Sequence, residues 1–165
     1  MSIYYAYPTA GYNIPELNDQ IETELSSLSS RYHVPKPSWT WTSINTHFEP
    51  LNLTICISDY VGAIWNRRAE YRDKISKLVS WEVAHEFKHY LDQHRFLAGD
   101  NRGQVVIRHI ERRRLLKQWF MTYGVVPKFE QDAAMFATQF TGMNQDQYDN
   151  LYSSLQPWNI PDFVL

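Results

Sequence analysis

The sequence predicts an α+β fold in which a small twisted sheet packs on helices. Several segments repeat apolar residues at helical spacing, and two others alternate apolar and polar residues as strands do. The chain has 165 residues, of which 44% are hydrophobic, 15% aromatic and 21% charged, with a net charge of −2. This composition is typical of a globular protein, and the length indicates a single domain spanning residues 1–165.

The first predicted element is an amphipathic helix over residues 15–32. Pro15 suits the first position of a helix, where its missing N–H group removes no hydrogen bond. The apolar residues that follow recur every three or four positions, which places them on one face. They are Leu17, Ile21, Leu25, Leu28 and Tyr32.

Two strands are predicted next. Residues 39–44 alternate aromatic and small polar side chains after a turn at Pro35 and Pro37. Residues 51–58 alternate strictly, so one face should carry apolar side chains and the other polar or small ones. The apolar face comprises Leu51, Leu53, Ile55 and Ile57, and the opposite face comprises Asn52, Thr54, Cys56 and Ser58.

A long helix is predicted over residues 76–92, which contain no Pro or Gly. Apolar residues recur there at every fourth position, as on the buried face of a helix. The charged residues 66–77 form either the exposed first turns of this helix or a separate helix before it. The buried stripe comprises Ile75, Val79, Val83, Phe87 and Leu91.

Three more helices should follow a loop at residues 98–103. The first spans residues 104–122. The second carries Glu130 and an apolar stripe, and ends near Phe140 because Gly142 follows. The third is short and covers residues 146–155. The first helix should partly bury Val106, Ile107, Ile110, Leu115 and Trp119, and the stripe of the second comprises Phe129, Ala133, Phe136 and Phe140.

The sequence His85-Glu86-Phe87-Lys88-His89 lies within the long predicted helix. Residues four apart share one face, with Cβ atoms roughly 5–6 Å apart, so both imidazoles can reach one metal ion. Glu86 lies about 100° further round, near enough to take a proton from a metal-activated water. The alternative is that both histidines are structural and satisfied by neighbouring groups. The motif favours a zinc site with Glu86 as the general base.

Residues 82–91 resemble the active-site helix of the zincin metallopeptidases, in which mostly apolar residues surround the two histidines. Lys88 and Glu82 depart from that pattern. The resemblance implies a zinc-dependent endopeptidase acting on a protein or peptide, with substrate adding to the free edge of the strand before the helix. The residues that fit are Val83, Ala84, Phe87, Tyr90 and Leu91.

A catalytic zinc needs a third protein ligand. Asp92 and Arg95 stand where the metzincin branch has Gly and His, which argues against that branch. Residues 128–137 resemble the gluzincin pattern Glu-x-x-Ala-Asp-x-Phe-Ala, which implies Glu130 as the ligand. Ala134 departs from it, because the family has Asp or Asn there. The candidates, in order, are Glu130, Asp132, Glu111 and His94, and the candidate donors to a reaction oxyanion are Tyr123, His109 and His94.

A basic stretch from Arg95 to Lys117 supports a different function. It has seven Arg or Lys residues against Asp100 and Glu111, a local charge of about +5. Such a helix can contact phosphates. The alternative to a peptidase is therefore a nucleic-acid-associated or virion-associated binding protein on a zincin-like fold, and a third interpretation is an ordinary solvated helix face.

Cysteine content and the lack of targeting signals exclude further classes of protein. Cys56 is the sole cysteine, which excludes an internal disulfide and cysteine-rich zinc modules. The N-terminus lacks a basic region followed by an apolar core, and no apolar run approaches the length of a membrane span. We therefore expect a cytoplasmic protein that does not insert into a membrane.

Overall fold

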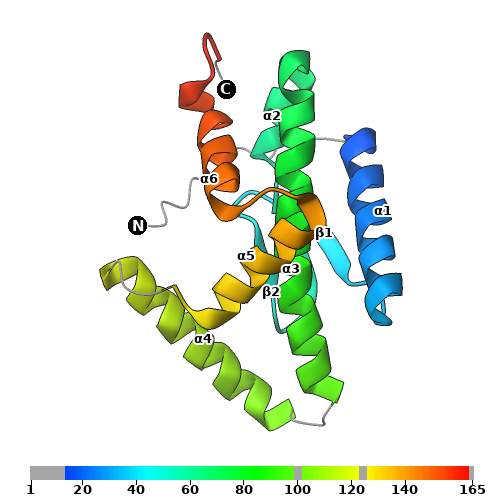
Figure 1. Cartoon of the computed structure of the whole chain (residues 1–165), viewed down its shortest axis with the longest axis vertical. Helices are drawn as coiled ribbons and strands as arrows, with labels where there is room; N and C mark the ends of the chain where they lie inside the picture. The colour runs from blue at the N-terminus through cyan, green and yellow to red at the C-terminus, as the bar shows by residue number, and fades with distance from the viewer. Residues whose placement is uncertain (1–13, 99–101, 123–125, 164–165) are drawn as a thin grey trace.

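The computed structural model describes residues 14–98, 102–122 and 126–163. It is a mixed α+β structure in which a small sheet packs on helices, chiefly on α3 (Figure 1). Residues 1–13, on which the expectation about a signal peptide rests, lie outside the described residues. The elements are α1 (Pro15–Tyr32), β1 (Ser38–Thr42), β2 (His47–Glu49), β3 (Thr54–Ser58), α2 (Tyr60–Arg67), η1 (Ala69–Tyr71), α3 (Arg72–Ala98), α4 (Arg102–Thr122), α5 (Lys128–Thr141), α6 (Gln145–Ser154) and η2 (Pro157–Asn159).

Helix α1 confirms the prediction for residues 15–32. Pro15 begins the helix, and His33 ends it in the left-handed conformation with φ 54°. Its apolar face packs against α3, which runs beside it (Figure 1). Four of the five predicted apolar residues, Leu17, Ile21, Leu25 and Leu28, are buried, and Tyr32 packs at the edge of the same core.

The sheet has three strands in the order β1-β3-β2, with β1 parallel and β2 antiparallel to β3. Strand β1 matches the predicted first strand to within two residues, whereas β2 was not predicted. Strand β3 is paired on both sides. The expectation that the strand before the long helix offers a free edge is therefore wrong, because within the described sheet the edge strands are β1 and β2.

The second predicted strand is shorter than expected. Residues 51–53 form a turn, with Leu51 62% exposed and Leu53 at φ 52°. In β3 itself both faces are buried, since Cys56 and Ser58 are covered as well as Ile55 and Ile57. The predicted alternation is consistent with β3, but its polar face is covered as well because β3 is the central strand, where small side chains such as Cys56 and Ser58 are readily buried.

Helix α3 runs through the middle of the molecule and contacts the sheet and the helices α1, α5 and α6 (Figure 1). The charged residues 66–77 comprise the end of α2, the η1 turn and the exposed start of α3. Burial of each large apolar side chain on the α3 stripe stabilises the fold by about 1.5–3 kcal/mol. The five stripe residues Ile75, Val79, Val83, Phe87 and Leu91 are all at most 1% exposed, as predicted.

Helix α5 crosses α3 and packs closely on it (Figure 1). Ala133 and Ala137 are fully buried at this contact, and their small side chains let the two backbones approach. Gly142 follows α5 with φ 76°, a conformation that glycine adopts without steric cost. The predicted end of this helix and the short helix α6 are both confirmed.

Helix α4 diverges from α3 and lies to one side of the molecule (Figure 1). Leu115 and Trp119 are partly buried as predicted, but Ile110 is 61% exposed, which contradicts the prediction for that residue. The side chains of Val106 and Ile107 lie outside the described residues, as do residues 99–101 of the predicted loop.

Candidate metal centre

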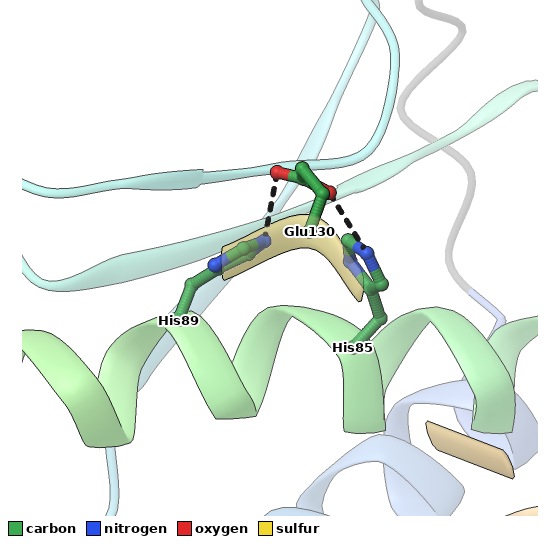
Figure 2. A group of neighbouring side chains, drawn as sticks. All are labelled: His85, His89 and Glu130. Carbon is green, nitrogen blue, oxygen red and sulfur yellow. Dashed lines mark ion pairs between the residues drawn. The ribbon is translucent and has the colours of Figure 1, made fainter. Parts of the chain in front are cut away.

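Helices α3 and α5 bring His85, His89 and Glu130 together. The Glu130 carboxylate lies between the two imidazole rings, with one oxygen directed at each (Figure 2). His85 Nε2 is 3.1 Å from Glu130 Oε2, and His89 Nε2 is 3.1 Å from Glu130 Oε1. Glu130 is 41 positions after His89 in the sequence, yet it lies beside both histidines because α5 crosses α3 at the motif.

The donor set suits a metal ion. One ligand atom from each residue lies within 4.8 Å of the others. Ligand atoms about 2.0–2.1 Å from a tetrahedral zinc lie roughly 3.3–3.4 Å apart, and each imidazole lies 3.1 Å from a different oxygen of Glu130. The cluster could therefore hold a metal ion.

The site is largely shielded from solvent. The side chains of His85, His89 and Glu130 are 14%, 8% and 18% exposed. His85 stacks on Trp81 with ring centroids 5.1 Å apart, and Trp81 stacks on Tyr148 at 4.0 Å. These rings fix the plane of one imidazole, which is a requirement for a well-defined ligand geometry.

The three groups are strongly coupled electrostatically. Burial alone lowers the pKa of His85, but the carboxylates of Glu86 and Glu130 outweigh burial and raise the pKa to about 10. Burial acts to raise the pKa of Glu130, yet hydrogen bonds from His85 and His89 hold it well below its usual range. The carboxylate therefore stays ionised and attracts positive charge, whether from protons or from a cation.

Glu86 lies beside the cluster and is 7% exposed. Its Oε1 is 2.9 Å from His85 Nδ1, the ring nitrogen that faces away from Glu130. A proton on Nδ1 would be donated to this carboxylate and would leave Nε2 free as a ligand atom. In this conformation Glu86 orients His85, a role that the sequence did not suggest.

The other candidate ligands are not part of the cluster. Asp132 pairs with Lys128, and Glu111 pairs with Arg114. His94 lies against the ring of Tyr90, with centroids 5.7 Å apart. Of the candidate oxyanion donors, His94 is thus away from the cluster, while Tyr123 and the side chain of His109 lie outside the described residues.

Glu82 is a buried carboxylate one turn before the motif, and the sequence indicated only that it departs from the zincin pattern. Tyr148 Oη donates to Glu82 Oε1 and Thr46 Oγ1 donates to Glu82 Oε2, both at 2.8 Å. Thr46 also accepts from the backbone N–H of Ser58 at 2.9 Å. Glu82 therefore ties α3 to α6 and to the sheet, and only the tertiary contacts make this visible.

No protein-family model, curated protein or solved structure matches this chain. Within residues 14–98, 102–122 and 126–163, no helix combines the length and apolar character needed to cross a membrane. Function is therefore inferred from the geometry of the site and from the sequence motif.

Proposed function

We propose that the protein is a zinc-dependent metallopeptidase of the zincin type, similar to gluzincins, with His85, His89 and Glu130 as zinc ligands. The observation that carries this proposal is the Glu130 carboxylate, which lies 3.1 Å from Nε2 of both histidines. Two imidazoles and one carboxylate are the ligand set of many catalytic zinc sites, which leave a fourth position for water or substrate.

A bound zinc ion would polarise the scissile carbonyl and lower the pKa of the attacking water. Glu86 would accept the proton of that water and return it to the leaving amine. Its carboxylate contacts His85 Nδ1 in the described conformation, so this role requires rotation of the Glu86 side chain towards the reacting groups. Trp81 would keep the His85 ring in place meanwhile.

The edge of β2 is the natural place for an extended substrate. Within the described residues, strand β2 pairs with β3 alone, through His47, Phe48 and Glu49. Phe48 contacts Tyr90 of α3, with ring centroids 6.3 Å apart, which links this edge to the motif helix. A peptide that adds to β2 through backbone hydrogen bonds would lie along the same helix.

The first experiment is the zinc content of purified wild type, His89→Ala, Glu130→Ala and Asp132→Ala by mass spectrometry. About one zinc per chain is expected in wild type, with loss in H89A and E130A. Asp132→Ala is the matched control because it removes a carboxylate from the same helix, two residues away, and should retain zinc. Wild type that stays free of zinc after reconstitution would refute the proposal.

The second candidate function is nucleic-acid or virion-associated binding through the basic stretch. The observation in its favour is that Arg113, Arg114 and Lys117 are exposed on α4, which lies to one side of the molecule (Figure 1). Arg114, however, is already paired with Glu111. Binding to duplex DNA that weakens steeply with salt would support this candidate.

A further inference from the structure

Arg112, in the basic stretch, is linked to the candidate metal centre through the ring of Phe129. Its guanidinium carbon lies over the Phe129 ring, 4.8 Å from the ring centroid. The Phe129 ring is in turn 6.0 Å from the ring of His89. Arg112, Phe129 and His89 therefore form a row that runs from α4 to a candidate zinc ligand.

The guanidinium of Arg112 has no carboxylate partner within salt-bridge distance among the described residues. The neighbouring acids are engaged elsewhere: Asp92 with Lys88, Glu111 with Arg114, and Glu130 with the two histidines. Arg112 is partly buried, whereas Arg113 next to it is exposed. A partly buried cation is stabilised by a paired anion, and Arg112 has no such pair within the described residues, so this position suits an anion supplied from outside the chain.

The electrostatics agree with this interpretation. Burial and the nearby Arg108 lower the pKa of Arg112, while Asp92 and Glu130 act in the opposite direction. The guanidinium lies against the Phe129 ring, and its N–H groups have no carboxylate partner within salt-bridge distance among the described residues. Those groups match a carboxylate, which they bind in bidentate fashion.

We propose that Arg112 forms an anion-binding subsite beside the metal centre and receives a carboxylate of the substrate. This inference rests on the proposed peptidase function and narrows its substrate class. The carboxylate belongs either to an acidic side chain near the scissile bond or to the free C-terminus of the peptide. The first source describes an endopeptidase that prefers acidic sequences, and the second an enzyme that trims peptide ends.

The binding test uses zinc-loaded protein and alkyl hydroxamates, which chelate zinc through one end. Each probe carries a carboxylate or a carboxamide at the far end, and several chain lengths are compared. Wild type should bind the carboxylate probe of the best length about tenfold or more tightly than its carboxamide partner. Calorimetry measures both affinities without any need for catalysis.

The variants distinguish a specific contact of Arg112 from the effect of the overall positive charge on α4. Arg112→Gln should abolish the carboxylate preference, and Arg112→Lys should keep part of it because the charge remains without the planar fork. Arg113→Gln is the matched control, since it removes the same charge one residue away on an exposed side chain, and should keep the preference. Zinc content and circular dichroism establish that each variant is loaded and folded.

Peptide cleavage then identifies the source of the carboxylate. Peptides with Glu or Gln at each position near the cleavage point are compared, each with a free or an amidated C-terminus. If Arg112→Gln removes a preference for Glu, Arg112 binds an acidic side chain of the substrate. If it removes a preference for the free C-terminus, Arg112 binds the terminal carboxylate. In either case KM should change more than kcat.

The outcomes distinguish the two proposals. Wild type that holds zinc but shows no carboxylate preference at any probe length overturns the role of Arg112 and leaves the peptidase proposal intact. If Arg112→Gln and Arg113→Gln lose the carboxylate preference equally, the role of Arg112 is also overturned, because the preference then comes from the overall positive charge of α4. Wild type that binds no zinc refutes both.

Discussion

At the scale of single residues, Glu86 combines two roles that substitutions can separate. Its carboxylate accepts from His85 Nδ1 in the described conformation and is the proposed base in the reaction. An amide at this position can still accept a hydrogen bond but cannot take up a proton. A methyl group can do neither.

Glu86→Gln should therefore retain zinc and lower kcat by about 10²–10⁴-fold. Glu86→Ala should lower kcat similarly and also weaken zinc binding by about tenfold, because the partner of His85 Nδ1 is lost. Metal titrations and peptide-cleavage rates measure the two effects. Equal zinc affinity in both variants would contradict the orienting role.

Glu82 makes the stability of the fold dependent on pH. Burial raises its pKa from 4.5 to about 7, against the opposing hydrogen bonds from Tyr148 and Thr46. The folded state therefore binds this proton more tightly than the unfolded state. The contribution of Glu82 is fully present below pH 4.5 and is lost as the pH rises through about 7.

Glu82→Gln should remove this part of the pH dependence, because the amide is an isostere of the protonated acid. Relative to wild type, the variant should gain on the order of 3 kcal/mol of unfolding free energy between pH 4.5 and pH 8. Denaturant unfolding at a series of pH values measures the difference. Glu16→Gln, which changes an exposed carboxylate on α1, is the control and should follow wild type.

At the scale of elements, the contact of α3 with α5 sets the position of Glu130. Ala133, one turn after Glu130, is fully buried at this contact. A larger side chain there would push the helices apart and carry the carboxylate away from the histidines. The distance from Glu130 to both Nε2 atoms thus depends on a residue that touches no metal.

Ala133→Leu should destabilise the fold by about 1–3 kcal/mol through overpacking and should weaken zinc binding. Met135→Leu is the matched control, because Met135 is on the same helix and 60% exposed, so its change should alter neither property. Thermal unfolding and zinc titration are the measurements. Wild-type zinc affinity in Ala133→Leu would show that α5 adjusts without moving Glu130.

The predictions of helices and strands differed in success for a physical reason. Helix α1 and the stripe of α3 were predicted correctly because their apolar spacing repeats over several turns. Strand β2 has only three residues, all partly exposed, and therefore carries no pattern. Ile110 was expected to be partly buried from spacing alone, but it is 61% exposed because no described element covers this part of α4.

At the scale of the whole molecule, a metal in this site would join α3 to α5 and so stabilise the fold. Zinc at 100 times its Kd should raise the free energy of unfolding by about 2.7 kcal/mol, provided that it binds the folded state alone. A chelator should reverse the gain. Thermal unfolding with and without zinc measures it, and His89→Ala, which lacks one ligand, should show no response.

Local periodicity was sufficient to predict the elements whose apolar side chains repeat regularly. It predicted the α+β class, the long helix that carries His85, Glu86 and His89, and the helix that carries Glu130. These features follow from residues within a few turns of one another, where the spacing of apolar side chains decides the local structure.

Which distant groups meet became clear from the packing of the helices. The sequence ranked Glu130 first among four candidates, and the structure places Glu130 beside the motif, apart from Asp132, Glu111 and His94. The structure also placed Glu82 in a buried network, set Glu86 against His85 Nδ1 and laid Arg112 over Phe129. The angle at which helices cross depends on packing between segments far apart in the chain, and no local pattern encodes it.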